Sequence, residues 1–452
     1  MKAKFLSTIA ACIVLLNALA QWEEVGTVGP LNANGAINDI HISQMWNSIF
    51  VGGNFKNLDN YYYVAYLSST DKWKEIYASN GPLQANNSIY TIASDINDNV
   101  YIGGMFTEGG DYIIALYEQT TDTFVILGNK PFNGYIRTMI IDASGNLYAA
   151  GAFKNNQNQY YVAKWDGNSF SELGTGANAL NPNGEIKCLA VDNAGNVYAA
   201  GFFTSAPNKY NVMKWNGSSW SEVGVLNANN YINDIAVDAA GNLYAAGGFT
   251  APGSIAYIAK WDGTNWIQPG NPGFNNYVFD LEVDRNNNLY AAGAFKNANN
   301  KAFVAKWNGS TWTEVGGNNS LAPNDDILSV AIDLDDNVYA AGYFTNANGY
   351  YYVAKYTIPA TGVKETEQPR VIKTFPNPFN NFIEVKFEES NFDINNKIEV
   401  LDVTGRSIYL QMGLQNGQHK IDTQNWDAGF YVIRAYNSND TATSIIRVVK
   451  SN

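Results

Sequence analysis

One sequence motif recurs seven times along this chain and limits the folds that the chain can adopt. Val237–Phe249 (VDAAGNLYAAGGF) is its clearest copy, and successive copies lie 46 to 51 residues apart. Helical repeats of similar length would place apolar residues three and four positions apart, and these copies do not. A strand-rich repeat of this period is typical of a β-propeller blade. The copies end on Phe55, Phe106, Phe153, Phe203, Phe249, Phe295 and Phe344.

Each repeat contains four strand signals joined by recognisable turns. In the fifth copy, the apolar run Ile232–Asp238 leads through an AAGN turn into a second strand, Leu243–Phe249. The Asp that begins this turn can accept backbone hydrogen bonds, and the Gly before Asn suits a left-handed conformation. Asp-Gly or Asn-Gly pairs such as Asp166-Gly167 then join the third and fourth strands, because a type I′ hairpin turn needs positive φ at both positions.

The strand order at the two ends of the repeat region predicts a closed ring. A WxEVG-like fourth strand occurs at Trp22–Val25 before any other strand signal, whereas the last repeat, Ile327–Tyr356, has only three strands. Pairing these two segments completes the last sheet and removes an exposed edge. The chain is therefore predicted to be all-β, with a seven-bladed β-propeller over residues 21–357 whose N-terminal strand closes the last blade.

Charge and the first residues indicate where the protein acts. The net charge of −13 disfavours nucleic acid and anionic membrane surfaces as partners. Residues 1–20 combine a basic start, an apolar stretch and a small-residue box, which is typical of a secretory signal cleaved between Ala20 and Gln21. The apolar stretch is too short to span a bilayer, and no other segment predicts a membrane helix, so we expect no integral membrane protein.

A second domain of different pattern follows the repeats. Residues 358–371 lose the strand pattern and are interpreted as a linker. Residues 372–452 contain six or seven short strand signals, which favours a small immunoglobulin-like β-sandwich. This segment carries an FPNP box, a VLDVTG run and a GFYV run before a basic end. The distinguishing residues are Phe375, Pro376, Asn377, Pro378, Gly405, Gly429 and Tyr431.

In the joint order of these motifs, residues 372–452 resemble the C-terminal sorting domain of the type IX secretion system of Bacteroidota. The resemblance implies export through the periplasm, recognition by the type IX machinery and removal by a sortase-like peptidase. The product would be anchored at the outer cell surface or released. The propeller repeats are similar to kelch-type and other secreted bacterial propeller repeats, a likeness that concerns the fold only.

The sequence offers few catalytic or metal-binding arrangements. His41 and His419 lie in different predicted domains, which disfavours a multi-histidine zinc centre or a copper centre of the galactose-oxidase type. No nucleophile elbow, Walker loop or HExxH motif is present. The acidic turns at 95–99 and 333–337 lack the distal Glu of a calcium loop, so Asx turns are favoured. Cys188 is expected to be a small packed residue. We expect no catalytic residue, no metal and no cofactor.

Candidate ligand-binding residues lie where the repeats differ. The loops from strand two to three and from strand four to one are longer, share one face, and are rich in Asn, Gly and Tyr. Binding sites favour such loops on a rigid scaffold. The tryptophans share repeat positions, so core packing explains them better than sugar stacking. The candidates, at the channel and its mouth, are Asp39, Tyr135, Arg137, Lys187, Tyr231, Asp234, Tyr277 and Asp280.

Three functions are compatible with these features. The leading hypothesis is an exported, cell-surface or released propeller that binds a glycan or a protein, because no catalytic arrangement accompanies the export signals. The first alternative is a polysaccharide-degrading hydrolase or lyase that uses carboxylates at the channel mouth. The second alternative is a structural component of a surface layer.

Overall fold

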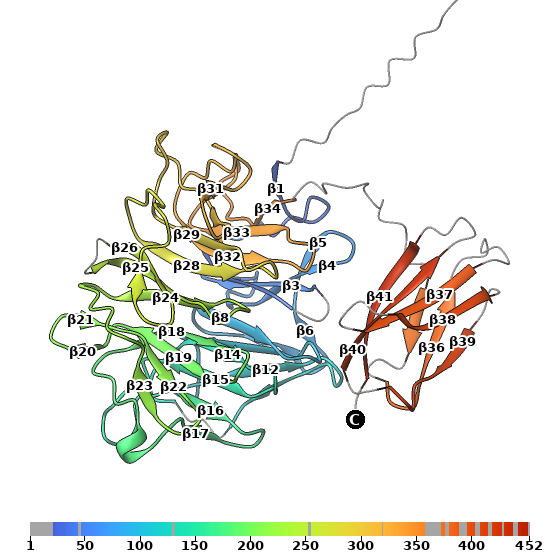
Figure 1. Cartoon of the computed structure of the whole chain (residues 1–452), viewed down its shortest axis with the longest axis horizontal. Helices are drawn as coiled ribbons and strands as arrows, with labels where there is room; N and C mark the ends of the chain where they lie inside the picture. Colours follow the sequence, from blue (N-terminus) through green and yellow to red (C-terminus); the bar gives the residue numbers. More distant parts are fainter. Residues whose placement is uncertain are drawn as a thin grey trace, which may run out of the picture. The chain divides into compact units, whose positions relative to one another are not determined.

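The chain divides into two compact units, Met1–Pro359 and Ala360–Asn452 (Figure 1). The computed structural model describes residues 21–43, 47–128, 132–251, 255–318, 320–357, 372–375, 379–387, 396–402, 407–414, 418–426, 429–436 and 442–450. The predicted signal, residues 1–20, and the predicted linker, residues 358–371, lie outside the described residues. Within the described ranges, no helix has the length and apolarity needed to cross a membrane.

In its described residues, the first unit contains seven four-stranded antiparallel sheets, which we call blades 1 to 7. Blades 1 to 3 are β2 (Ile37–Ile42), β3 (Ile49–Gly53), β4 (Ala65–Ser68) and β5 (Lys72–Glu75); β8 (Ile89–Ser94), β9 (Val100–Gly104), β12 (Ala115–Glu118) and β13 (Thr123–Ile126); and β14 (Ile136–Ile141), β15 (Leu147–Gly151), β16 (Ala163–Trp165) and β17 (Phe170–Glu172).

Blades 4 to 7 repeat this order. They are β18 (Ile186–Val191), β19 (Val197–Gly201), β22 (Met213–Trp215) and β23 (Trp220–Glu222); β24 (Ile232–Val237), β25 (Leu243–Ala251), β26 (Ile255–Trp261) and β27 (Trp266–Ile267); β28 (Val278–Val283), β29 (Leu289–Gly293), β30 (Ala305–Trp307) and β31 (Trp312–Glu314); and β32 (Ile327–Ile332), β33 (Val338–Gly342), β34 (Ala354–Tyr356) and β1 (Trp22–Glu24). The loops add a 3-10 helix, η1 (Gly176–Asn178), and the hairpins β6 (Tyr77–Ala78) with β7 (Gly81–Pro82), β10 (Thr107–Glu108) with β11 (Asp111–Tyr112), and β20 (Thr204–Ala206) with β21 (Lys209–Tyr210).

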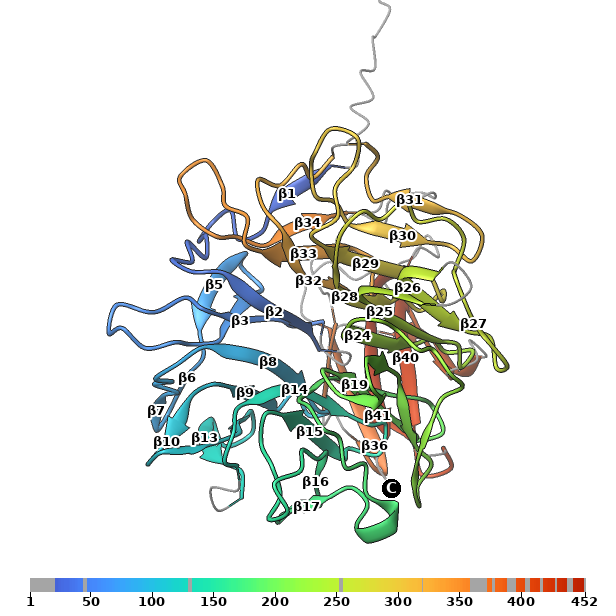
Figure 2. The same cartoon turned by 90° about the vertical axis from the view of Figure 1, so that its left-hand side faces the viewer.

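The blades form a closed ring (Figure 2), and residues of their first strands line two cavities that form a central channel. Each first strand contacts the first strand of the next blade, and β32 of blade 7 contacts β2 of blade 1. Strand β1 pairs with β34, with Trp22 opposite Tyr356, and Figure 2 shows blue β1 beside orange β34. The prediction that the N-terminal strand supplies the fourth strand of the last blade is therefore confirmed.

Small residues on the second strands let neighbouring blades approach closely. Every residue of β3, β9, β15 and β19 is buried. A Cβ added at Gly52 would lie 2.5 Å from Cγ2 of Ile89 in the next blade, and one at Gly103 would lie 2.8 Å from Cγ2 of Ile136. These distances are shorter than van der Waals contact, so side chains at these positions would force the blades apart.

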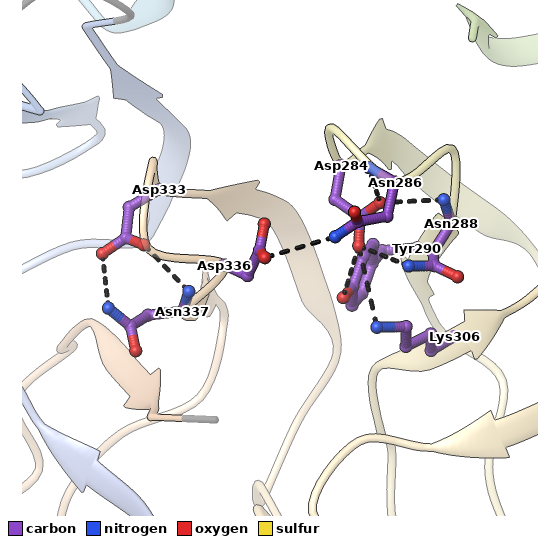
Figure 3. A network of polar contacts seen from close by, with 8 residues as sticks. All are labelled: Asp284, Asn286, Asn288, Tyr290, Lys306, Asp333, Asp336 and Asn337. Carbon is purple, nitrogen blue, oxygen red and sulfur yellow. Dashed lines mark hydrogen bonds and ion pairs between the residues drawn. The ribbon is translucent and has the colours of Figure 1, made fainter. Parts of the chain in front are cut away.

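A carboxylate network holds the turns between the first and second strands (Figure 3). In blade 6, Oδ1 of Asp284 accepts the backbone N–H groups of Asn286 and Asn288 at 2.9 and 2.8 Å. Its Oδ2 accepts Nδ2 of Asn288 at 2.7 Å and the hydroxyl of Tyr290 at 3.1 Å. Nζ of Lys306 lies 3.6 Å from the same oxygen. One side chain therefore fixes the turn and both strands that follow it.

These turns also contact one another between blades. Figure 3 shows Nδ2 of Asn286 directed at Asp336 of blade 7, to whose Oδ2 it donates at 3.3 Å. The left-handed conformation that the sequence predicts is confirmed, since φ is 83°, 79°, 82°, 60° and 63° at Gly145, Gly195, Gly241, Asn287 and Asp336.

Tryptophans of the fourth strands join neighbouring blades at the outer edge. Nε1 of Trp266 donates to the carbonyl of Val223 in the preceding blade at 2.8 Å. Trp22, Trp73, Trp220 and Trp312 donate to the preceding blade in the same way. Packing and this bond account for the recurrence of tryptophan at one repeat position.

The second unit is a β-sandwich with one core. One sheet contains β35 (Ile372–Phe375), β36 (Phe382–Phe387) and β39 (Gln418–Asp422), and the other contains β38 (Ser407–Leu414), β37 (Asn396–Asp402), β40 (Gly429–Tyr436) and β41 (Ala442–Lys450). Phe379, Ile383, Val400, Ile433 and Val448 are buried in its core. The predicted small sandwich after the propeller is confirmed.

Candidate functional site

A β-bulge in every first strand places two consecutive side chains in the central channel. In blade 3, Ile136 pairs with Gly151 and Thr138 pairs with Ala150, so Arg137 is the extra residue. The same register shift occurs in the other six blades. A bulge interrupts the alternation of side chains along a strand. Arg137 and Thr138 therefore both line the channel.

Two rings of seven residues line one cavity of about 590 Å³. We call the bulged residues the rim ring and the residues after them the inner ring. Asn54, Tyr62, Ser88 and Tyr343, from the two longer sets of loops, complete the wall. The rim ring is Asn38, Tyr90, Arg137, Lys187, Asn233, Phe279 and Leu328, and the inner ring is Asp39, Thr91, Thr138, Cys188, Asp234, Asp280 and Ser329.

Polar side chains of the inner ring hold successive blades together. Oδ2 of Asp39 accepts the backbone N–H of Ile92 in the next blade at 2.6 Å. The hydroxyls of Thr91 and Ser329 accept an N–H of the following blade at 3.2 Å each. Because carboxylates and hydroxyls make the same contact, this ring position joins blades. Asp234 and Asp280 accept the N–H groups of Leu281 and Val330 at 2.8 and 2.7 Å.

Burial changes the protonation of the inner-ring carboxyls. It raises the pKa of Asp39 to about 7 and that of Asp280 to about 6, although backbone N–H donors act in the opposite direction. Burial and the neighbouring Asp280 hold the pKa of Asp234 well above its ordinary value, and the two carboxyls share a hydrogen bond. A carboxyl pair that shares a proton is also an arrangement used in acid–base catalysis.

Arg137 and Lys187 are the two cationic residues of the rim ring, and the adjacent blades 3 and 4 supply them. The Arg137 guanidinium carbon lies 4.8 Å from the ring centroid of Tyr90. Nζ of Lys187 donates to Oδ1 of Asn233 and lies 5.7 Å from the ring centroid of Tyr231. Burial, together with the charge of Arg137, lowers the pKa of Lys187 to about 8.

The three candidate tyrosines lie beside the cavity and do not line it. The hydroxyl of Tyr135 donates to Oε2 of Glu185 at 2.7 Å. Tyr231 and Tyr277 stack with their ring centroids 6.2 Å apart, and Tyr277 covers the backbone of Gly248. The structure thus brings Asp39, Arg137, Lys187, Asp234 and Asp280 into one cavity and leaves Tyr135, Tyr231 and Tyr277 outside its wall.

Sequence reasoning missed five of the seven rim-ring residues, namely Asn38, Tyr90, Asn233, Phe279 and Leu328. They share a repeat position with Arg137 and Lys187, so the alignment of the repeats contained the signal. Strand alternation nevertheless assigns that position to the face opposite the inner-ring position. The bulge that overrides this rule is visible only in the register of the paired strands.

A second cavity of about 370 Å³ continues the channel beyond the inner ring. His41 and Glu282 line it, and Nε2 of His41 lies 2.8 Å from Oγ of Ser94. Burial lowers the pKa of His41 to about 4, so its ring is neutral at pH 7. Burial, with the charges of Asp280 and Asp39, raises the pKa of Glu282 to about 8. These shifts favour the uncharged forms of both side chains.

The loops from strand two to three and from strand four to one share one face of the propeller, which we call the loop-rich face. Asparagines on this face have a structural role. Oδ1 of Asn34, in the loop before the first strand, accepts the backbone N–H of Lys56 at 2.8 Å, and Nδ2 donates to the Lys56 carbonyl. In each blade the N–H of the residue after the motif phenylalanine has such an acceptor. The other six are Asn86, Asn133, Asn183, Asn229, Asn275 and Asn324. The abundance of Asn on this face therefore does not indicate ligand contacts.

The acidic turns and the cysteine behave as ordinary structural elements. Asp95 and Asp333 accept backbone N–H groups two and four residues on, as the other turn aspartates do. Cys188 is buried and unpaired. Among the described residues, no three His, Cys, Asp or Glu side chains are grouped to hold a metal ion.

Several sorting-motif residues can be placed in the second unit. Phe375 ends β35 and Gly429 begins β40. Tyr431 is buried in the core. Pro376, Asn377, Pro378 and Gly405, and also Ala20 of the predicted signal cleavage site, lie outside the described residues, whereas Gln21 lies within them.

Comparison with known families identifies the end of the chain. Residues 373–450 match the secretion system C-terminal sorting domain, and residues 64–240 match the Rax2 C-terminal beta propeller domain. The resemblance to the type IX sorting domain is confirmed, and this domain indicates export to the outer cell surface or secretion. A search of curated proteins gives no match to this sequence.

Solved structures with similar folds have little sequence in common with this chain. The extracellular domain of a protein described as a hybrid two-component system of B. thetaiotaomicron has a TM-score of 0.51 at 12% identity, covering 96% of this chain and 58% of that one. A fungal alcohol oxidase solved with copper has a TM-score of 0.54 at 12% identity, covering 96% and 100%. PorZ, a surface component of the type IX secretion system of Porphyromonas gingivalis, has a TM-score of 0.48 at 13% identity, covering 92% of this chain and 60% of its own length. At such identities the likeness concerns the fold alone.

Proposed function

We propose that the exported propeller is a binding module that holds an extracellular glycan, or a segment of a protein, in its central cavity. The observation that supports this function is the bulge in all seven first strands, which lines a cavity of about 590 Å³ with two full rings. That volume lies in the usual range of ligand sites, about 300–1,000 Å³. The rim residues differ from blade to blade, so one ligand would meet cations, amides and aromatic rings.

Binding is favoured over catalysis because the inner-ring carboxylates already have a structural partner. Asp39, Asp234 and Asp280 each accept a backbone N–H of the next blade, as Thr91 and Ser329 do. A contact shared by carboxylates and hydroxyls needs no catalytic explanation.

A second candidate function is a polysaccharide-degrading hydrolase or lyase. The hydrogen bond shared by Asp234 and Asp280, and the raised pKa of both carboxyls, favour it. A carboxyl group that stays protonated near neutral pH can donate a proton to a leaving group, while an ionised neighbour acts as base or nucleophile.

The sorting domain suggests the remaining partners. In this proposal the type IX machinery recognises residues 372–452, and a sortase-like peptidase removes them. The propeller, residues 21–357, would then be anchored at the cell surface or released.

The two candidate functions differ in their response to the loss of one carboxylate. We expect the exported protein to bind one or more ligands on an array of extracellular glycans and surface proteins, without release of new reducing ends. Asp234→Asn and Asp39→Asn should bind within about 3-fold of the unchanged protein, because an amide oxygen still accepts the N–H of the next blade. Turnover that Asp234→Asn abolishes would establish the hydrolase instead. If the protein associated specifically with itself and bound no ligand, the structural role in a surface layer would be favoured instead.

A further inference from the structure

The rim ring contains two cations, and neither forms an ion pair with a described acidic residue, in a protein with 41 acidic and 28 basic residues. In the described part of the chain, the ion pairs are Lys214 with Asp192 and Lys306 with Asp284, both at the turns between first and second strands. Arg137 and Lys187 form neither. An excess of acids makes unpaired cations on a cavity wall unexpected unless something else neutralises them.

The nearby carboxylates of Glu185 and Asp234 act on Lys187 through their charge, which raises its pKa, but neither forms an ion pair with it, and Oε1 of Glu185 is buried without a hydrogen-bond partner. Glu185, two residues before Lys187, accepts the hydroxyl of Tyr135. Asp234, on the adjacent blade, accepts the N–H of Leu281 and shares a hydrogen bond with Asp280. The two cations therefore face the cavity, and an anion that enters from the loop-rich face would meet them before it reaches the inner ring.

Aromatic rings stand next to both cations. Arg137 lies over the ring of Tyr90. Lys187 lies 5.6 Å from the ring centroid of Phe202 and 5.7 Å from that of Tyr231. Phe202 is 38% exposed, and Tyr343, which lines the same cavity, is 44% exposed. Exposed aromatic faces suit the C–H groups of a sugar ring, because the ring face is negative and the C–H groups are weakly positive.

We propose that Arg137 and Lys187 bind the carboxylate of an acidic saccharide, such as a uronic acid residue, whose ring packs against aromatic side chains next to these two cations. This inference rests on the proposed binding function and specifies its ligand class. The planar Arg137 fork suits a carboxylate, and Lys187 adds a second charge-assisted hydrogen bond. A cavity of about 590 Å³ accommodates a short saccharide and not a folded domain.

The test compares two probes with the same sugar chain, charged trigalacturonate and its uncharged methyl ester, by calorimetry with the exported protein. We expect trigalacturonate to bind at least about 100-fold more tightly than the ester, and its affinity to fall as salt increases. Arg137→Gln and Lys187→Met should each weaken trigalacturonate about 10- to 100-fold and leave the ester unchanged. Lys187→Arg should restore most of the affinity.

The matched control is Lys260→Met, which removes the same charge from β26, where Lys260 lies over Tyr244 outside the cavity. It should not change trigalacturonate binding. Equal affinity for acid and ester would overturn the charge pairing and leave the binding function intact. If a triglutamate peptide bound as tightly as trigalacturonate, the preference for a saccharide would be wrong, and the site would bind anions in general. Failure of every glycan and surface protein on the array would overturn both proposals.

Discussion

At the scale of single residues, Asp284 shows how strongly one carboxylate can fix a turn. Asp284→Ala would leave the N–H groups of Asn286 and Asn288 and the hydroxyl of Tyr290 without their acceptor (Figure 3). Because Asp284 is buried, we expect the free energy of unfolding to fall by about 3 kcal/mol. Urea denaturation of the exported protein, followed by tryptophan fluorescence, measures this loss.

Two matched variants separate burial from turn geometry. Asp166 accepts the N–H groups of Asn168 and Ser169 in an exposed hairpin turn, so Asp166→Ala should cost less because water replaces the carboxylate. Asp284→Asn keeps one acceptor oxygen and should fall between the two alanine variants. Equal losses for Asp166→Ala and Asp284→Ala would contradict the role assigned to burial.

Residue-scale reading of the sequence succeeded where a local rule decides the conformation. The turn aspartates accept the predicted short-range hydrogen bonds, and the residues predicted to be left-handed have positive φ. The structural role of the loop asparagines was not predicted, because hydrogen bonds such as those between Asn34 and Lys56 join segments 22 residues apart. Composition alone cannot distinguish an Asn side chain that bonds the backbone of a loop from one that binds a ligand.

At the scale of elements, strand β1 joins the start of the propeller to its last blade. Trp22 donates to the carbonyl of Val315 at 3.2 Å, and Glu24 accepts Nδ2 of Asn346. We expect Trp22→Ala to lower the unfolding free energy by about 3–5 kcal/mol and to increase hydrogen exchange selectively at Ala354–Tyr356. Exchange measured by mass spectrometry locates the change.

The control for β1 is an equivalent tryptophan inside the ring. Trp220 donates to the Leu173 carbonyl at 2.7 Å, but a hairpin joins its strand to the rest of blade 4. Trp220→Ala should therefore leave the exchange at Ala354–Tyr356 unchanged. If both variants loosen this strand equally, closure does not depend on β1.

The four strands of each blade were predictable in number and order because their apolar pattern and turn signals are local, but the three hairpins in the loops were not. The bulges were not, since the rim ring holds residues as different as Asn38, Arg137, Phe279 and Leu328, and none marks a bulge by type. The bulge arises where a first strand must pair with its own blade and also bond the next one. This requirement arises only when the blades form a closed ring, so no single segment of the sequence reveals it.

At the scale of the whole molecule, the ring concentrates carboxyl groups in its channel and links stability to pH. The pKa values of about 7 at Asp39, 6 at Asp280 and 8 at Glu282 lie above those of the unfolded chain, near 4. The folded state therefore binds more protons, and this stabilisation is complete below about pH 4 and is lost as pH rises through these values. His41, with a pKa of about 4, acts in the opposite direction only between about pH 4 and 6.5.

The aspartates in the turns between first and second strands have the opposite pH dependence, so they destabilise the protein at low pH. Burial raises the pKa of Asp142 and Asp192, but hydrogen bonds from Asn146 and Asn196 outweigh it and leave each pKa below its ordinary value. Their contribution to stability is present above about pH 4 and is lost as pH falls below it. The two groups of carboxylates together place the maximum of stability near pH 4.

We therefore expect the midpoint of thermal unfolding to fall by about 3 °C or more between pH 6.5 and pH 8, because Asp39 and Glu282 lose protons in this range and His41 opposes them only weakly. Scanning calorimetry of the exported protein at fixed ionic strength measures this slope. Asp39→Asn and Glu282→Gln, which cannot ionise, should each reduce it, because the channel then releases one proton fewer on unfolding. Glu108→Gln in the β10–β11 hairpin, an exposed carboxylate outside the channel, should leave it unchanged. A midpoint that rises from pH 6.5 to pH 8 would show that the channel carboxyls are ionised in the folded ring.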